Sequence, residues 1–385
     1  MLKIGTIYTL YGRRAGAELY FEKILKGMIE TSSDIEVLIY CNNEAYNALP
    51  ENLRIIKNKI SWLNNQFSKA FWLEFLAASF AEKAKLDLFW IPSGCNSFPG
   101  RWRIPNVVTF LDFGEYHVKS KYDFKRMVYR KHFCVLRSIR RAKTITTISH
   151  FTANDMVRLF RVGVPIRVIY PGPSPLNNAD PDANHLSVIR QETGIELSRF
   201  IFTPGRTDYI GKGLDVLLDA YGSWSQKVSD IPDLVLVGPQ GEDHEAFVNH
   251  ISQLGLGTRI KYFGRVSDRC VAALYTLCEF VVIPSRFEGF GFPVLEAMRF
   301  GKPMICSDAG SLPEVAAGAA LLFRTGDASN LLAMMTEMHC NAALRVRLMG
   351  AGAKRCTEFD WNTTYDQMYN VFLEATGNRK KQGAP

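Results

Sequence analysis

Short apolar runs alternate with longer amphipathic stretches along the whole chain, which predicts strands that alternate with helices. The apolar runs are rich in β-branched residues, and this order of elements is typical of parallel sheets with crossover helices. Each of two series of strands can form its own sheet. The first series is Ile35–Tyr40, Asp87–Ile91, Val107–Asp112 and Thr144–Ser149, and the second is Phe200–Pro204, Leu234–Gly238, Phe280–Pro284 and Met304–Ser307.

A break in both periodicities separates the two series. Residues 170–175 read Tyr-Pro-Gly-Pro-Ser-Pro and lead into a polar run, and proline fixes the backbone and removes hydrogen-bond donors. A length of 385 residues also fits two domains better than one. We therefore predict an α/β chain with a first domain over residues 1–172 and a second over residues 173–359. Such sheets bind ligands at the carboxyl ends of their strands, so function is expected in a cleft between the domains.

The composition is that of a globular protein. Hydrophobic residues make up 47% of the chain and no run of about 18 apolar residues occurs, so a membrane span is not expected. The first residues read as a strand rather than a signal peptide, and the eight cysteines have no spacing that suggests zinc or a redox couple. We expect a cytoplasmic protein, either soluble or peripheral on the inner face of the membrane. The net charge of +8 is compatible with anionic partners.

The segment from Pro284 to Gly301 combines a strand end, a glycine-bearing loop and a short helix. Gly289 and Gly291 permit close approach of the backbone to a ligand, and Pro293 suits a first helical position, where its missing N–H is harmless. A helix that begins after such a loop presents unpaired N–H groups and the positive end of its dipole. The segment therefore predicts a phosphate site.

Two glutamates accompany this helix start. Glu296 falls in the predicted first turn, where its carboxylate can accept hydrogen bonds from ribose hydroxyls, and Glu288 on the preceding loop can reach a second polyhydroxylated group. Two acidic groups beside a phosphate site suggest a sugar nucleotide. The alternative is that Glu296 only complements the helix dipole and that Glu288 is a solvated loop residue.

The segment of residues 202–213 adds two cations. Arg206 follows a buried strand directly, and Lys212 stands between two glycines at the start of the next helix. Such a pair can bind a diphosphate and stabilise the negative charge that grows on it as a glycosidic bond breaks, whereas the alternative is ordinary surface charge. A P-loop is rejected because the glycine spacing is five residues instead of four and a glycine replaces the metal-binding Ser or Thr.

These segments together resemble the family 4 glycosyltransferases, and the resemblance spans essentially the whole chain. It implies the GT-B fold, in which two Rossmann-like domains face one another with the nucleotide-sugar site in the cleft between them. Glu288 and Glu296, separated by seven residues, match the paired-glutamate motif of the family. Arg206 and Lys212 match its diphosphate-binding pair. Residues 310–314 match as well, and they predict a capping box between Ser and Glu at the start of a helix.

The resemblance implies roles for the matched positions. Glu296 should bind the ribose and Glu288 the hydroxyls of the donor sugar, and Arg206, Lys212 and Glu288 are the expected catalytic residues. The base should lie beside Arg265 and Val266. The remaining donor-binding residues are Gly16, on the loop before a predicted helix over Leu19–Ile29, and Gly205, Gly289, Phe290, Gly291 and Phe292. No metal and no cofactor are expected, because the nucleotide sugar is a substrate.

The implied activity is the retaining transfer of a hexose from a nucleotide-diphosphate sugar, with UDP-glucose favoured, to a glycan or lipid-linked acceptor in bacterial-type polysaccharide or glycolipid synthesis. The first domain should bind the acceptor and the second the donor. In this fold the last helix returns to the first domain, so residues 360–385 are assigned to it. A nucleotide-sugar epimerase of the same fold and a non-catalytic nucleotide-sugar-binding protein are the alternatives.

One position departs from the family pattern. Many members have a histidine before the aspartate that ends the strand corresponding to Val107–Asp112, but here Leu111 precedes Asp112. His117 lies five residues further on; a lone histidine is more often structural, and Asp112 and His117 are kept as candidates for the acceptor or catalytic region. Asp180-Pro-Asp182 resembles a metal-binding acidic pair of another glycosyltransferase architecture, but its place in the polar linker favours a structural interpretation.

Residues 119–143 contain ten Lys and Arg against one acid, interleaved with aromatic residues. The pattern predicts a basic amphipathic helix that can hold the protein against an anionic membrane surface, where a lipid-linked acceptor would be found. A solvated face is the alternative. Nucleic-acid binding is not expected because no recognised binding module accompanies the basic segment.

Overall fold

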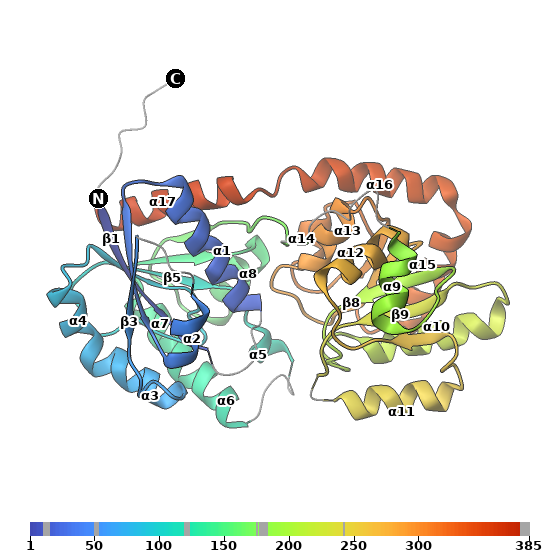
Figure 1. Cartoon of the computed structure of the whole chain (residues 1–385), viewed down its shortest axis with the longest axis horizontal. Coiled ribbons are helices and arrows are strands. Elements are labelled where there is room, and N and C mark those ends of the chain that lie inside the picture. Colours follow the sequence, from blue (N-terminus) through green and yellow to red (C-terminus); the bar gives the residue numbers. More distant parts are fainter. Residues whose placement is uncertain are drawn as a thin grey trace, which may run out of the picture. The chain divides into compact units, whose positions relative to one another are not determined.

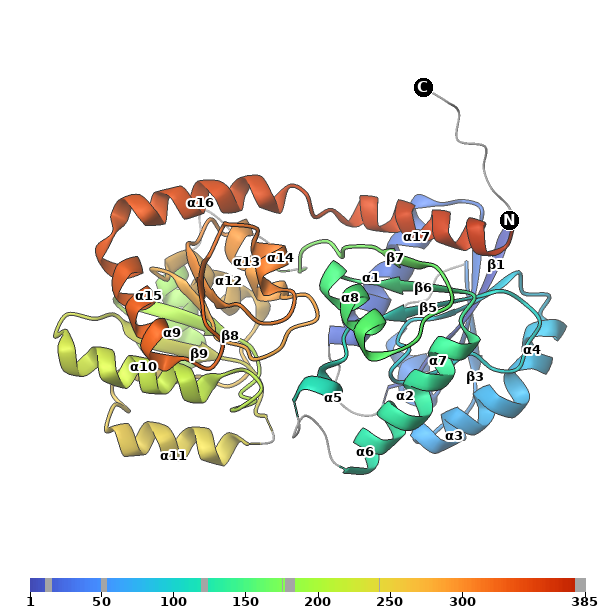
Figure 2. The same ribbon diagram turned by 180° about the vertical axis from the view of Figure 1, so that it is seen from behind.

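A computed structural model describes residues 1–10, 16–49, 54–118, 124–174, 176, 184–241 and 243–377. The chain divides into two units (Figure 1). Unit 1 comprises Met1–Gly172 together with Asp360–Pro385, and unit 2 comprises Pro173–Phe359. Each unit contains one parallel β-sheet with helices on both faces, as Figures 1 and 2 show from opposite sides.

The described strands of unit 1 form a seven-stranded sheet in the order β3-β2-β1-β4-β5-β6-β7, and all neighbours are parallel. The direction of the strand order changes between β1 and β4, which creates the switch point where open α/β sheets bind ligands. The strands are β1 (Leu2–Tyr8), β2 (Ile35–Cys41), β3 (Ile55–Lys59), β4 (Leu88–Ile91), β5 (Asn106–Phe110), β6 (Thr144–Thr147) and β7 (Ile166–Val168).

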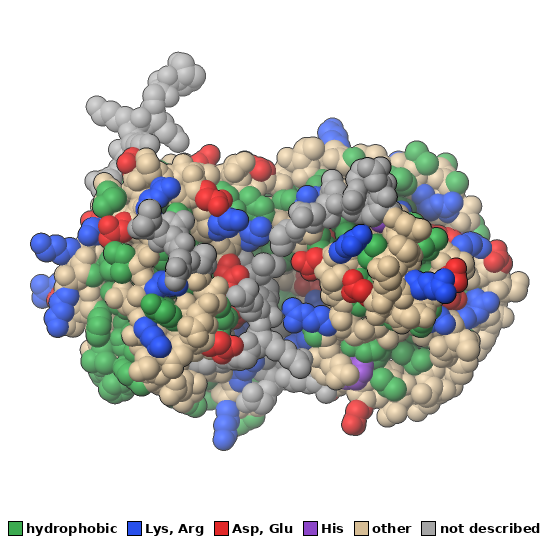
Figure 3. Space-filling view, in the orientation of Figure 1, with side chains coloured by type: hydrophobic (Ala, Val, Ile, Leu, Met, Phe, Trp, Pro, Cys, Tyr) green, Lys and Arg blue, Asp and Glu red, His purple; other side chains and the backbone are tan. Residues whose placement is uncertain are grey.

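The helices of unit 1 cover both faces of this sheet. They are α1 (Gly16–Thr31), α2 (Asn43–Ala48), α3 (Gln66–Phe71), η1 (Trp72–Leu76), α4 (Ala77–Lys83), α5 (Gly114–His117), α6 (Phe124–Val128), η2 (Tyr129–Cys134), α7 (Val135–Arg141), α8 (His150–Leu159) and α17 (Trp361–Ala375). The η elements are π-helical turns that join their neighbours into the stretches α3–η1–α4 and α6–η2–α7. Figure 3 shows hydrophobic side chains gathered at the lower left, over α3 and α4.

The last helix, α17, packs within unit 1 although it follows unit 2 in the sequence. Its ring at Tyr365 lies against Gly27 of α1, where a Cβ atom would come within 1.9 Å of the ring, so the contact requires glycine. Phe372 of α17 packs on Trp90 of β4 with ring centroids 5.9 Å apart. These contacts explain why α17 is rich in aromatic residues.

Unit 2 repeats the architecture with a six-stranded parallel sheet of described strands in the order β10-β9-β8-β11-β12-β13. The strands are β8 (Phe200–Pro204), β9 (Asp233–Val237), β10 (Ile260–Tyr262), β11 (Val281–Ile283), β12 (Met304–Ser307) and β13 (Leu321–Phe323). The helices are α9 (His185–Thr193), α10 (Leu214–Lys227), α11 (His244–Leu254), α12 (Asp268–Leu277), α13 (Phe292–Arg299), α14 (Leu312–Ala316), α15 (Ala328–Cys340) and α16 (Ala342–Cys356).

Each of the predicted strands is present, and the differences lie at their ends. Strand β5 ends at Phe110 because the Asp112 carboxylate accepts a hydrogen bond from the Gly114 N–H at 2.8 Å and so forms a turn. The prediction that Gly16 belongs to the loop before the first helix is wrong: α1 begins at Gly16, since the Ala and Glu that follow are good helix formers. Asp180, Asp182 and residues 119–123 lie outside the described residues.

None of the helices among the described residues combines the length and the apolar content that crossing a membrane would require.

Candidate functional site

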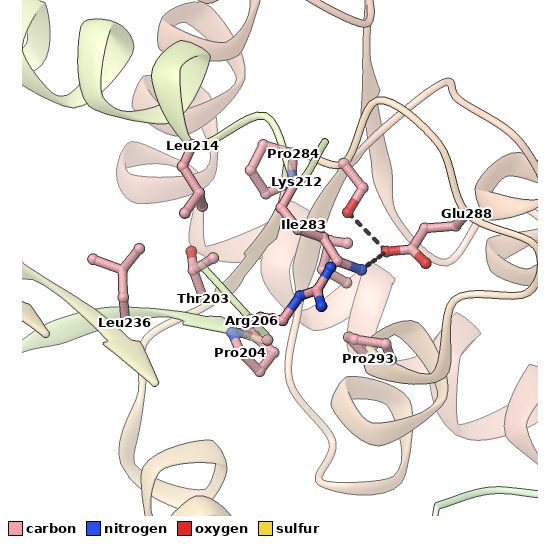
Figure 4. A pocket seen from close by; sticks show the side chains of 12 residues that line it. Thr203, Pro204, Arg206, Lys212, Leu214, Leu236, Ile283, Pro284, Glu288 and Pro293 are labelled. Carbon is pink, nitrogen blue, oxygen red and sulfur yellow. Dashed lines mark hydrogen bonds and ion pairs between the residues drawn. The ribbon is translucent and has the colours of Figure 1, made fainter. Parts of the chain in front are cut away.

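A pocket opens where β8 and β11 end in unit 2 (Figure 4). These strands are neighbours in the sheet, so the loops that follow them meet at its carboxyl edge. The pocket is lined by Arg206 and Lys212 from the first loop and by Glu288 from the second, three residues that the sequence analysis selected. We call this pocket the cation pocket.

Lys212 and Glu288 form an ion pair in the cation pocket although they are 76 positions apart in the sequence. The Lys212 ammonium nitrogen lies 2.6 Å from the Glu288 Oε1, which also accepts a hydrogen bond of 2.8 Å from the Ser285 hydroxyl. An ammonium group has three donors and a carboxylate has several lone pairs, so both groups can bind a ligand and keep their pairing. The ion pair therefore orients each group and leaves it able to form hydrogen bonds with a ligand.

Arg206 brings a second cation to the pocket, and its guanidinium is almost half exposed. The nearest carboxylate is that of Asp208, at 3.5 Å, which leaves the guanidinium loosely held compared with Lys212. The turn before it depends on Gly205, whose φ is +124°. At the neighbouring strand end, a Cβ atom on Gly238 would lie 2.0 Å from the Gly205 carbonyl oxygen, so only glycine permits this close approach.

Arg286 ties the two loops of the cation pocket together. Its guanidinium makes two hydrogen bonds of 2.6 Å to the two carboxylate oxygens of Asp215 on α10, and a further one of 2.7 Å to the Ile210 carbonyl. Its backbone N–H also donates to the Gly211 carbonyl at 3.0 Å. A bidentate pair of this kind fixes direction as well as distance. The clamp was not predicted from the sequence, because its partners lie 71 positions apart.

The backbone of Glu288 is held by the loop before α14. Both the backbone N–H and the hydroxyl of Ser311 donate to the Glu288 carbonyl, each at 3.1 Å. Gly310 has a φ of +60°, and a Cβ atom there would lie 2.3 Å from the same carbonyl oxygen. The predicted capping box at residues 310–314 is therefore wrong. Ser311 has helical rather than extended backbone angles and makes no side-chain cap, so its hydroxyl supports Glu288 instead.

A second pocket adjoins the first and is lined by Glu296, Arg265 and Val266. We call it the Glu296 pocket. Pro204 and Gly205 line both pockets, so the two share a wall. The Glu296 pocket is open to solvent.

Glu296 is held in place by two donors. The Tyr275 hydroxyl donates to its Oε2 at 2.7 Å, and the Ser174 side chain makes another hydrogen bond. Burial raises the pKa of Glu296, and these hydrogen bonds oppose the rise without cancelling it. Glu296 is the fifth residue of α13, beyond the first turn in which it was predicted, so a helix-dipole role accounts poorly for its position.

The other candidate donor residues of unit 2 form the turn between the two glutamates. Gly291 has a φ of +97° at the start of α13, and a Cβ atom there would lie 2.7 Å from a methyl group of Leu312. The Phe290 ring is buried and packs on Phe292 and Phe359, with centroids 5.3 Å and 5.8 Å apart. Gly289 to Phe292 are not among the residues that line either pocket, so their contact with the donor stays a prediction.

The remaining candidates, Gly16, Asp112 and His117, belong to unit 1. The His117 Nε2 lies 2.6 Å from the buried carboxylate of Asp155, which also binds the Arg158 guanidinium at 2.9 Å. Asp155 was not selected from the sequence, where it reads as one polar residue of an amphipathic helix. The contact shows what positions the His117 ring.

No cluster of three or more His, Cys, Asp or Glu side chains that could hold a metal ion occurs among the described residues.

Two family models match the chain, one in each unit. The model described as glycosyl transferases group 1 matches residues 187–355, and the model described as glycosyltransferase family 4 matches residues 14–174. Together they cover most of both units and include every residue that lines the two pockets apart from residue 176. The protein is thus a glycosyltransferase. It belongs to family 4 of these enzymes.

Similar proteins agree with this assignment. The O-antigen chain mannosyltransferase B of Escherichia coli is 27% identical over 69% of this chain and 69% of its own length. The phosphatidyl-myo-inositol mannosyltransferase of Mycobacterium leprae is 29% identical over 49% of this chain and 50% of its own length.

Solved structures match the fold over nearly the whole chain. The sucrose-phosphate synthase of Thermosynechococcus elongatus is 18% identical, with a TM-score of 0.77 over 98% of this chain and all of its own. Anabaena Alr3699/HepE, solved in complex with UDP and glucose, is 20% identical, with a TM-score of 0.73 over 97% of this chain and all of its own. At this identity the likeness concerns the fold alone, and it confirms the predicted GT-B class.

Proposed function

We propose that the protein transfers a hexose from a nucleotide-diphosphate sugar to a glycan or lipid-linked acceptor, with retention of configuration, in polysaccharide or glycolipid synthesis. One observation carries the proposal: a pocket with two cations and a carboxylate shares the wall at Gly205 with a pocket that holds a partly buried carboxylate. The first suits a diphosphate with its attached sugar, and the second suits a ribose with its base. The names of the relatives support the acceptor classes.

In the cation pocket, Arg206 and Lys212 hold the diphosphate and stabilise the charge that develops on it as the glycosidic bond breaks. Lys212 keeps Glu288 on one N–H and donates another to phosphate, while the free carboxylate oxygen of Glu288 accepts a hydrogen bond from a hydroxyl of the donor sugar. The acceptor hydroxyl attacks on the face that the leaving group occupies. Its proton passes to the departing phosphate oxygen, so the charges of this step balance without a metal ion.

In the Glu296 pocket, the ionised carboxylate of Glu296 accepts hydrogen bonds from the ribose hydroxyls, since Tyr275 and Ser174 already fix its orientation. The base lies against Arg265 and Val266, which also line this pocket. Because these contacts are the same before and during bond breaking, they contribute to affinity rather than to rate.

UDP-glucose is the donor that we propose. A solved neighbour of the same fold was obtained with UDP and glucose, which supports this choice. The names of the curated relatives favour a second candidate, a donor that carries mannose.

The deciding experiment is a binding panel of UDP-, GDP- and ADP-sugars, followed by measurement of nucleotide release from the tightest binder with and without candidate acceptors. Acceptor-dependent release identifies a transferase and its donor, and the NMR coupling constants of the product establish retention. Activity should be unchanged in EDTA, and its loss would contradict the metal-free step. Binding without release would indicate a nucleotide-sugar-binding protein, an isomerised sugar without acceptor would indicate an epimerase, and no binding would overturn the proposal.

We further propose a peripheral position on the cytoplasmic face of an anionic membrane. The described part of residues 119–143 supports this proposal, because α6, η2 and α7 form one helical stretch whose residues 124–141 include seven Lys and Arg and no acid.

A further inference from the structure

The helical stretch α3–η1–α4 has apolar side chains on two faces. On the inner face, Trp72, Leu73 and Ala77 are fully buried in the core of unit 1. On the outer face, Phe67 and Phe75 are 68% and 65% exposed, with Phe71 between them at 54%. Residues four apart lie on one face of a helix. Because a surface helix with one buried face usually has polar residues on the other, the packing of unit 1 does not account for these rings.

Aromatic contacts link these exposed rings to one another or to a neighbouring aromatic ring. Phe71 lies between Phe75, at a centroid distance of 5.0 Å, and Trp62, at 6.3 Å. Phe67 lies 6.0 Å from the ring of Tyr129 on η2. We call Trp62, Phe67, Phe71 and Phe75 the aromatic stripe. Single exposed apolar residues are ordinary, whereas a contiguous patch marks an interaction site.

A strongly basic surface borders the aromatic stripe. The stretch α6–η2–α7 lies beside α3 in both views (Figures 1 and 2), and the Tyr129 hydroxyl donates to the Gln66 carbonyl at 3.2 Å. Lys125 and Arg140 of this stretch are exposed, and so is Phe124, at 82%. The apolar and the basic side chains therefore occur side by side on neighbouring helices, which is the composition of surfaces that lie in a lipid interface.

One acidic residue next to Phe75 in the sequence does not oppose this charge. Glu74, on the same helical stretch, binds the Arg141 guanidinium at 2.7 Å and the Arg101 guanidinium at 2.8 Å. The hydrogen bond from Arg141 is the main cause that lowers the pKa of Glu74, so the carboxylate is ionised and neutralised by two cations. Glu74 therefore adds no unpaired negative charge beside the stripe, and the exposed cations of the neighbouring stretch complement a surface that is apolar and anionic.

We propose that the aromatic stripe and the basic stretch α6–η2–α7 form one docking surface for an anionic lipid bilayer. The phenylalanine rings and Trp62 insert at the level of the lipid head groups, while Lys125 and Arg140 contact lipid phosphates. This inference rests on the proposed function, in the form in which the acceptor is lipid-linked rather than a free glycan. It adds the residues of α3 and η1, which contribute the apolar part of the attachment that basic residues alone lack.

The test uses the full chain and sedimenting vesicles of phosphatidylcholine, with or without 30 mol% phosphatidylglycerol (a composition of about one anionic lipid in three). The wild type should bind the anionic vesicles, and the triple variant F67S/F71S/F75S should bind them with a partition coefficient lower by at least about tenfold. The variant V157S/V346S removes exposed apolar side chains elsewhere and should bind like the wild type. The variant K125Q/R140Q should lose the preference for phosphatidylglycerol.

Insertion of the stripe is read directly from fluorescence. A Phe71→Trp variant should show a blue-shifted emission with anionic vesicles and quenching by lipids brominated on the acyl chains. Unchanged emission with vesicles that sediment the protein would show that attachment uses another surface, and it would overturn the proposal.

Binding of the nucleotide sugar is measured on the same samples, and it should be equal in the wild type and the triple variant. A wild type that binds its donor but no vesicles overturns the docking surface and the proposed membrane position, and leaves the proposed hexose transfer intact. A wild type that binds vesicles through the stripe but no donor supports the docking surface and overturns the proposed hexose transfer. Concentration-dependent self-association in ultracentrifugation, abolished in the triple variant and without vesicle binding, would assign the stripe to a protein interface and overturn the proposal.

Discussion

The pairing of Lys212 with Glu288 decides how the cation pocket can work. A lysine side chain is flexible, and fixing it costs up to about 2 kcal/mol in lost rotamer freedom. At 2.6 Å from Glu288, Lys212 has lost that freedom before a ligand arrives. Arg206 is held more loosely, 3.5 Å from Asp208, and so retains more freedom to follow the phosphate during bond breaking.

Removing either cation should slow transfer far more than it weakens donor binding. For Lys212→Ala and Arg206→Ala we expect turnover to fall by about 10²- to 10³-fold, the usual effect of deleting a group that stabilises transition-state charge. Steady-state kinetics with the best donor measure this loss. Arg324→Ala serves as the matched control, because Arg324 is a more exposed arginine of the same unit paired with Asp327, and its removal should change turnover less than twofold. Losses of turnover below tenfold in both variants would indicate that Lys212 and Arg206 are ordinary surface charges without a role in catalysis.

The raised pKa of Glu296 predicts how donor binding depends on pH. Ribose recognition needs the ionised carboxylate, and burial raises the pKa of this carboxyl group above the usual value of glutamate. Donor affinity should therefore fall as the pH decreases through that raised pKa. In Glu296→Gln this acid limb should disappear, and affinity at neutral pH should drop about tenfold, since a hydrogen bond to a charged group is lost. Binding titrations from acidic to neutral pH measure both effects.

The raised pKa of Glu296 also predicts how the stability of the fold depends on pH, and this dependence runs opposite to that of donor affinity. A carboxyl group whose pKa is higher in the folded state stabilises the fold at low pH and loses that contribution as the pH rises through the folded value. Glu296→Gln should therefore unfold at the same or a slightly higher temperature at neutral pH, while Tyr275→Phe should unfold lower because its partner loses a donor. A Glu296→Gln protein that binds the donor normally and also melts at a lower temperature would contradict the assignment of Glu296 to ribose binding.

At the scale of single residues, the sequence is informative where a glycine-rich loop follows a buried strand. Such loops mark the carboxyl edge of a sheet, and for this reason Arg206, Lys212 and Glu288 could be expected near one another. The Arg286–Asp215 clamp and the Tyr275 hydroxyl could not be expected. Tyr275 lies on α12 and reads as a core aromatic, which it also is, and only its tertiary neighbours reveal the hydrogen bond to Glu296.

At the scale of elements, strands buried on both faces were predictable because they are continuous apolar runs. Strands β10 and β13 have three residues each and are only partly buried, so their short runs carry no such signal. The start of α14 shows a different failure. Ser and Glu three residues apart usually indicate a capping box. Here the serine hydroxyl instead donates a hydrogen bond to the Glu288 carbonyl.

This support predicts a specific sensitivity at Gly310. An alanine there meets both a φ of +60° and a carbonyl oxygen at 2.3 Å, so the Glu288 backbone must move. Gly310→Ala should weaken donor binding and turnover at least about tenfold and lower the thermal midpoint. Gly326→Ala is the matched control, because Gly326 has a φ of +82° but nothing within 4 Å of the added methyl group. It should lose stability from backbone strain without loss of donor binding; equal donor affinity in both variants would contradict the role of Gly310.

At the scale of the whole molecule, the alternation of strands and helices was enough to predict two parallel-sheet domains, and the comparisons confirm the GT-B class. The structure adds that each unit has its own core. Ile145 belongs to a buried cluster formed within unit 1, and Leu217 to another formed within unit 2. Both pockets are lined by residues of unit 2. A ligand that occupies them should therefore stabilise one core directly.

Separate cores predict two transitions in calorimetric unfolding, of which the best nucleotide of the binding panel raises only one. At 100 times its dissociation constant it should stabilise unit 2 by about 2.7 kcal/mol. Leu217→Ala and Ile145→Ala, both fully buried, should each cost about 2–5 kcal/mol and so label the transitions of units 2 and 1. The nucleotide should raise the transition that Leu217→Ala lowers. If the nucleotide instead raised the transition that Ile145→Ala lowers, the donor would bind unit 1, and the assignment of both pockets to the donor would be wrong.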